Sequence, residues 1–327
     1  MLGGHGETCD ACGTTRHIYH SCRNRHCPQC QTRAKEAWLA QRCRELLPVP
    51  YFHLVFTLPH ALHGLIGQQP RRLYETLFAA AAGTLTEFAA SPRHLDGEMA
   101  FSLVLHTWKQ DLARHVHVHA LVAGGALTAD GAWVSPRRGF LFPVKALSRV
   151  FRGKFVATLA AHRAAGRLPG VVYAKQPLGG PEQVLEYLGR YTHRVAVSNE
   201  RIVAVDEEGV AFRVRTAVGT GKKRTLHVAG ETFIERFLLH VLPPGFKRIR
   251  HYGLLAPAHK ARRLAMARAA LGMAAPDPVI IESVAAFMAR VARLAWGECQ
   301  QCRGGRFVVS APLPPRRGAG ASSRGPP

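Results

Sequence analysis

Acidic residues are scarce in this 327-residue sequence. It contains 21 Asp and Glu against 44 Lys and Arg, which gives a formal charge of +23 and a pI near 10.6. Positive charges in such excess repel one another within a compact fold. We therefore expect a polyanionic partner, and nucleic acid is the first candidate. The chain also lacks any run of the roughly 18 apolar residues that a membrane-spanning helix needs, and it opens without a secretory leader. These absences predict a cytoplasmic protein with no membrane partner.

Hydrophobic residues make up 47% of the chain, enough for one full core and a smaller accessory module. Alternating and helical patterns predict an α+β protein whose neighbouring strands form an antiparallel pair. The predicted strands are Tyr51–Leu58, Ala100–Trp108, Val116–Ala123, Val171–Lys175 and Phe246–Tyr252, with a hairpin within 195–215. The predicted helices are Arg33–Leu47, Pro70–Ala90, Val144–Ala165, Glu231–Val241 and Pro257–Leu271, with another after Pro181. The proline-rich end beyond Pro312 is predicted to be disordered.

Most of the eight cysteines occur in closely spaced pairs, which favours metal binding over disulfides. Fourteen residues separate the pair Cys9/Cys12 from the pair Cys27/Cys30, and two such knuckles can place four thiolates around a tetrahedral zinc ion. Cys22 could replace one ligand or help to hold a second ion. Nearby arginines make a DNA contact as plausible as a purely structural zinc site. The pair at 299 and 302 resembles half a zinc ribbon, but no second half follows it, so metal binding there is not favoured.

Three histidines alternate with valines in the run His115-Val116-His117-Val118-His119. On a strand they share one face while the valines enter the core on the other. Next-but-one neighbours stand about 7 Å apart, so two imidazoles can converge on one ion. The spacing alone does not choose between His115/His117 and His117/His119.

Two tyrosines lie four residues apart in the segment EQVLEYLGRYTHR and therefore share one helical face. Such a pair most often packs in a core, but here Arg190 and Arg194 suit a phosphate better. As a nucleophile near neutral pH, Tyr187 or Tyr191 would need positive charge or a metal beside the phosphate. A second basic element, the glycine loop GTGKKR, supplies three further candidate DNA contacts: Lys222, Lys223 and Arg224.

Together these motifs resemble the transposases of rolling-circle insertion sequences of the IS91 type, within the histidine-hydrophobic-histidine endonucleases. The similar stretches are Cys9–Gln31, Phe56–His60, Leu105–Leu127, Gly179–Asn199 and Phe237–Leu255. The resemblance selects His117 and His119 as the ligands of a catalytic divalent metal, magnesium or manganese. It also selects Tyr187 and Tyr191 as nucleophiles. Gln183, His193, His106 and His115 remain open as the third ligand.

The resemblance implies three parts. They are a zinc-binding domain over 1–47, a catalytic domain over 48–275 with the histidines on a central antiparallel strand, and a C-terminal part over 276–327 with a helix, the partial CxxC knuckle and the basic tail. It implies cleavage and rejoining of single-stranded DNA at the ends of a mobile element and at its target, through a 5′-phosphotyrosine, in the bacterial nucleoid. The alternatives are a plasmid replication initiator or relaxase with the same chemistry, or a non-catalytic zinc-dependent DNA-binding protein.

Overall fold

The chain divides into two compact units, one of which combines residues from both ends of the sequence. The computed structural model describes residues 2–22, 24, 32–137, 140–161, 171–175, 197, 201–215, 223–276, 286, 289–290 and 297–315, and the statements below concern these. One unit combines Met1–Asn24 with Asp277–Pro327, and the other spans Arg25–Pro276. Residues 25–47, predicted to belong to the zinc-binding domain, lie within the second unit. The two ends of the chain share the first unit because their strands pair.

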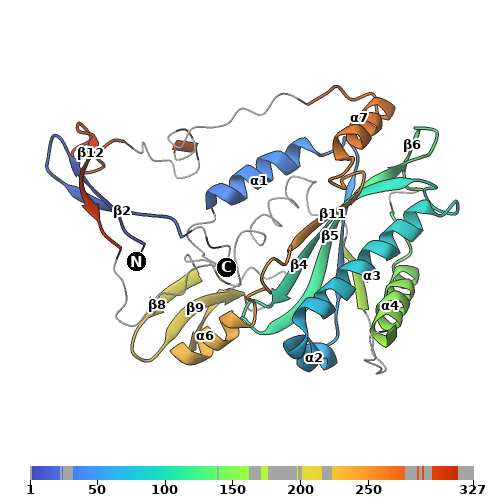
Figure 1. Cartoon of the computed structure of the whole chain (residues 1–327), viewed down its shortest axis with the longest axis horizontal. Coiled ribbons are helices and arrows are strands. Elements are labelled where there is room, and N and C mark those ends of the chain that lie inside the picture. The colour runs from blue at the N-terminus through green and yellow to red at the C-terminus, as the bar shows by residue number, and fades with distance from the viewer. Residues whose placement is uncertain are drawn as a thin grey trace. The chain divides into compact units, whose positions relative to one another are not determined.

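The first unit is a three-stranded antiparallel sheet in the order β12-β1-β2 (Figure 1). Its strands are β1 (Gly4–Cys9), β2 (Thr15–Tyr19) and β12 (Phe307–Leu313). Strand β1 lies in the middle, and Cys9 stands opposite Phe307. Within the described part of this unit, the only buried apolar side chains are Cys9 and Cys299. The sheet thus lacks the apolar core that stabilises most small domains.

The second unit contains a larger antiparallel sheet in the order β11-β4-β5-β3-β7, with β6 paired to β5 (Figure 1). The α+β class and the antiparallel sheet are as predicted. The strands are β3 (Tyr51–Thr57), β4 (Glu98–Trp108), β5 (Arg114–Leu127), β6 (Trp133–Val134), β7 (Val171–Lys175) and β11 (Ile249–Gly253). The long strand β5 lies at the centre, hydrogen-bonded to β4 and β3, and this places the histidine run inside the sheet.

One face of this sheet packs against helices α3 (Pro70–Ala90) and α4 (Val144–Ala161). Val116 and Val118 of β5 point into this core, together with Phe56 of β3 and Phe78 of α3. The short helices η1 (His60–Leu62) and α2 (His63–Gln68) lead into α3. Because side chains alternate along a strand, burial of the valines here turns the histidines of β5 to the opposite face.

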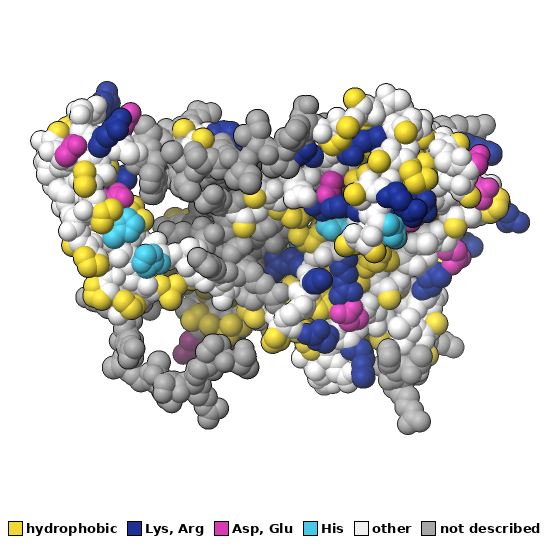
Figure 2. Space-filling view, turned by 45° about the horizontal axis from the view of Figure 1, so that its top comes forward, with side chains coloured by type: hydrophobic (Ala, Val, Ile, Leu, Met, Phe, Trp, Pro, Cys, Tyr) yellow, Lys and Arg dark blue, Asp and Glu magenta, His cyan; other side chains and the backbone are white. Residues whose placement is uncertain are grey.

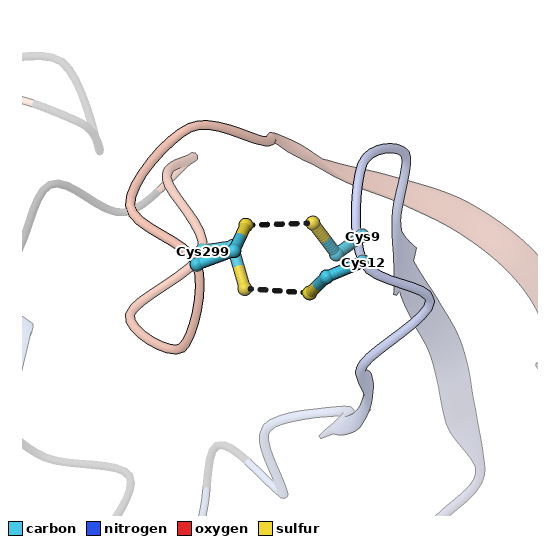
Figure 3. Close-up of side chains that lie close together, drawn as sticks. Cys9, Cys12 and Cys299 are labelled. Atoms are coloured by element: carbon cyan, nitrogen blue, oxygen red, sulfur yellow. Dashed lines mark hydrogen bonds between the residues drawn. The ribbon is translucent and has the colours of Figure 1, made fainter.

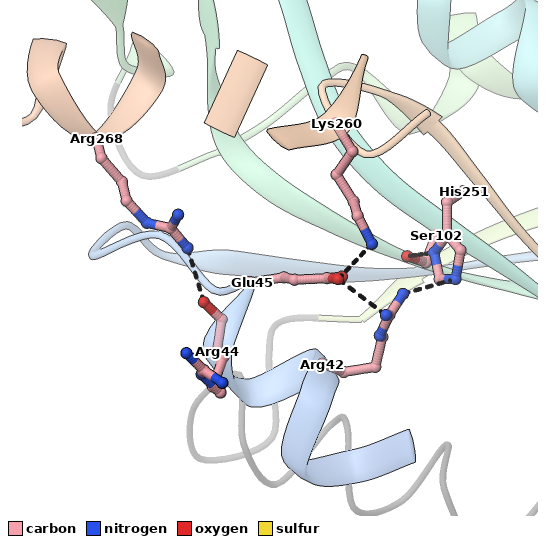
Figure 4. A network of polar contacts seen from close by, with 7 residues as sticks. All are labelled: Arg42, Arg44, Glu45, Ser102, His251, Lys260 and Arg268. Carbon is pink, nitrogen blue, oxygen red and sulfur yellow. Dashed lines mark hydrogen bonds and ion pairs between the residues drawn. The ribbon is translucent and has the colours of Figure 1, made fainter. Parts of the chain in front are cut away.

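On that opposite face, helices α1 (Thr32–Arg44) and α7 (Lys260–Ala270) pack over apolar residues of the sheet. A polar network ties them together (Figure 4). Glu45 accepts from Arg42 at 2.8 Å and from Lys260 at 2.5 Å, and Arg42 contacts Nε2 of His251 at 2.9 Å. Ser102 of β4 contacts Nδ1 of the same imidazole at 2.7 Å.

A second small sheet, in the order β10-β9-β8, carries helix α6 (Gly230–Leu238). It consists of β8 (Ile202–Val205), β9 (Val210–Arg215) and β10 (Lys223–Val228), and the turn between β8 and β9 lies at the predicted hairpin. Lys223 and Arg224, predicted to lie in a glycine loop, instead begin β10 and are exposed. None of the helices among the described residues is long and apolar enough to cross a membrane.

Candidate metal centre and transposase family

Three buried histidines converge on the face of the sheet opposite α3 and α4. His117 and His119 share one face of β5, and His106 lies directly opposite His117 on the neighbouring strand β4. Nε2 of His119 lies 3.0 Å from Nε2 of His117 and 3.1 Å from Nδ1 of His106. The three ligand atoms therefore occupy one small space, as a shared metal ion would require.

The spacing of these nitrogens fits metal ligands better than a hydrogen-bonded cluster. Nε2 of His119 has one lone pair or one proton, so it cannot hydrogen bond fully to two imidazoles at once. Ligands about 2.1 Å from an ion and at right angles to each other stand about 3.0 Å apart. The observed separations match that value, and a cation at their centre would remove the repulsion between the facing lone pairs.

The remaining ring nitrogens of the β5 pair bond to the protein. Nδ1 of His117 lies 2.9 Å from the carbonyl oxygen of His115, to which it can donate. Nδ1 of His119 lies 2.8 Å from Nε2 of His53 on β3. When both Nδ1 atoms carry the proton, both Nε2 atoms present lone pairs to the shared space, which is the tautomer that a metal needs.

Burial keeps the three imidazoles neutral near physiological pH. It lowers the pKa of His117 to about 4; the charges of His115 and His53 act in the same direction, and the hydrogen bond to the His115 carbonyl acts against it. Burial also places the pKa values of His106 and His119 well below the ordinary value. Because a metal binds the neutral ring, these shifts favour metal binding over protonation.

A basic edge flanks the three histidines. The His115 ring lies 4.8 Å from that of His117 and 6.0 Å from that of His60. Nζ of Lys109 lies 3.5 Å from Nε2 of His60, and Arg114 donates to the carbonyl oxygen of His63 at 2.8 Å. In the view of Figure 2, a group of Lys and Arg side chains lies on the larger unit, with some Asp and Glu side chains among them. Lys109 and Arg114 make this edge of the candidate site suitable for a polyanion.

Of the four residues left open as the third ligand, His106 joins the pair, whereas the ligand atoms of His115 lie outside the group. The sequence signal for His106 is its position in the predicted strand Ala100–Trp108, which comes just before the histidine run. Sequence analysis did not find His53. Several predicted residues lie outside the described part of the chain: Tyr187, Tyr191, Arg190, Arg194, Lys222, Cys27, Cys30, Gln183 and His193.

A second cluster of metal-ligating side chains lies in the first unit. Cys9 and Cys12 face Cys299 and Cys302 (Figure 3), and the four sulfur atoms lie within 4.8 Å of one another. Hydrogen bonds from the hydroxyl and the backbone amide of Thr14 lower the pKa of the Cys12 thiol to about 6, which favours its thiolate, whereas the pKa of the neighbouring Cys9 thiol is raised to about 11. Sequence analysis paired the first two cysteines with Cys27 and Cys30 instead. Metal binding at Cys299 and Cys302 was not favoured because no second cysteine pair follows them in the sequence. In the structure, the pair that faces them is Cys9 and Cys12, which precedes them.

The chain is similar in sequence to known transposases. Residues 1–58 match the family described as "Transposase zinc-binding domain", and residues 100–170 and 162–263 match the family described as "Putative transposase". The chain is 42% identical to "Putative transposase y4qJ" of Sinorhizobium fredii, over 92% of this chain and 82% of that protein. It is 28% identical to the transposase for insertion sequence element IS801 of Pseudomonas savastanoi, over 85% of this chain and 72% of that protein.

Solved structures of the conjugative relaxase TrwC in complex with oriT DNA are also similar. One covers 68% of this chain and 74% of its own, at 17% identity and a TM-score of 0.29. A copper-bound form covers 83% and 88%, at 13% identity and a TM-score of 0.32.

The sequence matches, together with the α+β fold and the cluster of three histidines, define a DNA transposase. The chain belongs to the IS91 family of insertion-sequence transposases, with a zinc-binding domain at its N-terminus.

Proposed function

We propose that this transposase cleaves and rejoins single-stranded DNA through a 5′-phosphotyrosine. The observation that carries the proposal is the convergence of His106, His117 and His119 within a transposase. Three neutral, buried imidazoles at ligand spacing are a costly arrangement unless they hold a cation. A protein that only binds DNA has no need of such a site in the middle of its sheet.

The three histidines would hold one divalent metal ion. An ion held by these residues would polarise a phosphodiester and offset the negative charge that develops on it during attack. The ligand set is imidazole alone among the described residues, with no carboxylate. Magnesium prefers oxygen ligands, so manganese suits these nitrogens better. His53 and the carbonyl of His115 hold the β5 imidazoles in the ligand tautomer.

The nucleophiles in this proposal are Tyr187 and Tyr191. The phenol oxygen of one forms a bond to phosphorus as the bond from phosphorus to the 3′ oxygen breaks. The phenol proton is lost and the 3′ oxygen gains a proton, so a free 3′-hydroxyl and a 5′-phosphotyrosyl link result. Reversal with another 3′-hydroxyl rejoins DNA without ATP, because the link conserves the energy of the phosphodiester. The second tyrosine accepts the second strand, which allows cleavage and joining to alternate.

Basic residues would bind the DNA backbone. Lys223 and Arg224 are exposed at the start of β10, and we assign the same role to Lys222, Arg190 and Arg194. The net charge of +23 supports binding through many phosphates. The substrates are the ends of the mobile element and the target DNA.

The test is capture of a covalent adduct on a labelled single-stranded oligonucleotide from an element end, with added manganese. The parent should form an adduct that survives denaturation. Tyr187→Phe and Tyr191→Phe should each keep some nicking through the other phenol, and the double variant should form none. His117→Ala/His119→Ala should also form none while it still binds the oligonucleotide.

His94→Gln serves as the matched control, because His94 packs against Phe88 and Phe142 on the α3 side of the sheet. It should form the adduct at the parent level. An adduct mapped by peptide mass to Tyr173, Tyr252 or a serine would refute the tyrosine assignment. Parental cleavage by the double histidine variant would refute the metal site.

A further inference from the structure

Two short cysteine loops from opposite ends of the chain meet in the first unit. One follows β1 and carries Cys9 and Cys12, and the other precedes β12 and carries Cys299 and Cys302. Sγ of Cys9 lies 3.7 Å from Sγ of Cys302, and Sγ of Cys12 lies 3.6 Å from Sγ of Cys299 (Figure 3). Cys12 and Cys299 are 287 residues apart in the sequence, so only tertiary structure brings them together.

The two loops have the same local form. In each, a backbone amide returns to the carbonyl oxygen of the first cysteine: Gly13 donates to Cys9 at 3.1 Å, and Arg303 donates to Cys299 at 2.9 Å. The residue after the second cysteine is left-handed in both, with φ of 69° at Gly13 and 57° at Arg303. A non-glycine residue adopts this conformation at a cost, so the second loop is held in place by its surroundings. Each turn presents its two sulfur atoms on one side.

Backbone contacts lock the loops against each other. The amide of Asp10 donates to the carbonyl of Arg306 at 3.0 Å, and the amide of Arg306 donates to Oδ1 of Asp10 at 2.8 Å. Gly305 lies so close to the other loop that a Cβ there would meet Sγ of Cys9 at 2.4 Å and Cβ of Ala11 at 2.7 Å. The close approach of the two cysteine pairs therefore depends on the absence of a side chain at position 305.

We propose that Cys9, Cys12, Cys299 and Cys302 bind one zinc ion that fastens the C-terminal strand to the N-terminal one. Four thiolates about 2.3 Å from a tetrahedral zinc stand about 3.8 Å apart, close to the observed separations. Thiolates select zinc over harder ions, and four protein ligands leave no open position for a substrate. The N-terminal zinc-binding domain is thus completed by residues at the other end of the chain.

The need for such an ion follows from the lack of an apolar core in this unit. Val308, Val309 and Tyr19 are exposed, and the two buried apolar side chains among its described residues are themselves ligands. A small sheet of this kind depends on a metal or on disulfides for its stability. The zinc ion would stabilise this unit in place of hydrophobic packing.

Zinc content of the full-length chain, measured by mass spectrometry of the metal, tests the proposal. Cys299→Ser/Cys302→Ser and Cys9→Ser/Cys12→Ser should each lose one zinc per chain. The quadruple variant should lose no more than either double variant, because all four residues share one ion. After replacement by cobalt, the parent should show the absorption of tetrahedral thiolate ligation, and each double variant should lose this contribution.

Cys27→Ser/Cys30→Ser is the control for the pairing expected from the sequence. If this variant loses the zinc that Cys9→Ser/Cys12→Ser loses, while Cys299→Ser/Cys302→Ser keeps the parental zinc and cobalt spectrum, the proposal is overturned. A disulfide between the two loops in freshly purified, unoxidised protein that contains no zinc would also overturn it.

A glycine pair provides a second test that leaves every ligand in place. Gly305→Ala should weaken zinc binding about ten-fold in a chelator competition, the lower end of the roughly 10- to 100-fold that loss of the contacts supporting metal ligands typically costs. Gly304→Ala should behave as the parent, because the nearest atom to a Cβ there is 3.9 Å away. Equal zinc affinity in the two variants would contradict the observed approach of the loops.

Discussion

The buried histidines of this protein have different roles, which depend on the residues around each imidazole. His117 and His119 face other imidazoles and are suited to metal binding, whereas the fully buried His240 belongs to no cluster of metal-ligating side chains among the described residues. Nε2 of His240 donates to the carbonyl of Leu112 at 2.9 Å, and Nδ1 contacts the Thr107 hydroxyl at 3.2 Å. Both nitrogens are satisfied in the neutral form, so His240 is a structural histidine.

His240 should make the fold sensitive to acid. Burial, with Arg114 and Arg248 nearby, lowers its pKa from 6.5 to about 4. Below pH 6.5 the His240 side chain binds a proton in the unfolded chain but stays neutral in the folded chain. The free energy of unfolding therefore falls as the pH drops from 6.5 towards 4. Between pH 7 and pH 5 this one group should cost about 2 kcal/mol.

Urea unfolding at the two pH values, followed by tryptophan fluorescence, measures this cost in the parent and in His240→Gln. Glutamine can keep the bond to Leu112 but does not titrate. The variant should lose less stability on acidification by about the stated amount. An equal loss in both proteins would assign the acid sensitivity to other histidines.

At the scale of elements, helix α1 is held to the sheet by charge as well as by apolar packing. Glu45, just after the helix, accepts from Arg42 and from Lys260 of α7, and its side chain is only 11% exposed. Arg42 donates in turn to His251, whose pKa is lowered to about 4 by burial and by the neighbouring cations. The neutral imidazole can accept that bond, so the network is consistent throughout (Figure 4).

Replacement of Glu45, the acidic residue of this network, should weaken the attachment of α1 to α7 and the sheet. Glu45→Gln keeps the shape but leaves two poorly solvated cations without a countercharge, and we expect a loss of about 2 kcal/mol in stability. Glu87→Gln is the control, since the Glu87–Lys154 pair is exposed and such pairs contribute about 0 to 1 kcal/mol. Thermal or urea unfolding compares the two, and equal effects would show that burial does not strengthen the network.

At the scale of the whole molecule, the dominant property is positive charge. A net charge of +23 predicts that affinity for single-stranded DNA falls steeply with salt, by a slope of about −0.7 per phosphate neutralised. Lys223→Ala/Arg224→Ala should reduce the magnitude of that slope by about 1.4. Lys154→Ala, on the α3 and α4 side and paired with Glu87, should leave it unchanged.

Fluorescence anisotropy over a series of salt concentrations measures these slopes. If the affinity of the parent did not depend on salt, binding through the phosphate backbone would be excluded. If the double variant kept the parental slope, Lys223 and Arg224 would not contact DNA.

Local patterns in the sequence were sufficient to predict most elements of the larger unit. Helix α3 and strand β7 have the predicted bounds, and the alternation in β5 predicted which face the histidines occupy. The periodicity of apolar residues carries this information, because it follows from helix and strand geometry alone. The transposase family was likewise recognisable from short motifs.

Tertiary structure decided which distant residues meet. His106 joins His117 because β4 and β5 pair in one particular register, and a shift of one residue would turn the histidines into the α3 and α4 core. Cys9 and Cys12 meet Cys299 and Cys302 because β12 pairs with β1, strands that the sequence pattern did not predict. The two strands are short and poor in buried apolar residues, so their pairing depends on partners almost a whole chain length away. Spacing along a sequence predicts local ligands such as Cys27 and Cys30, but it contains no information on strands that meet only in the folded chain.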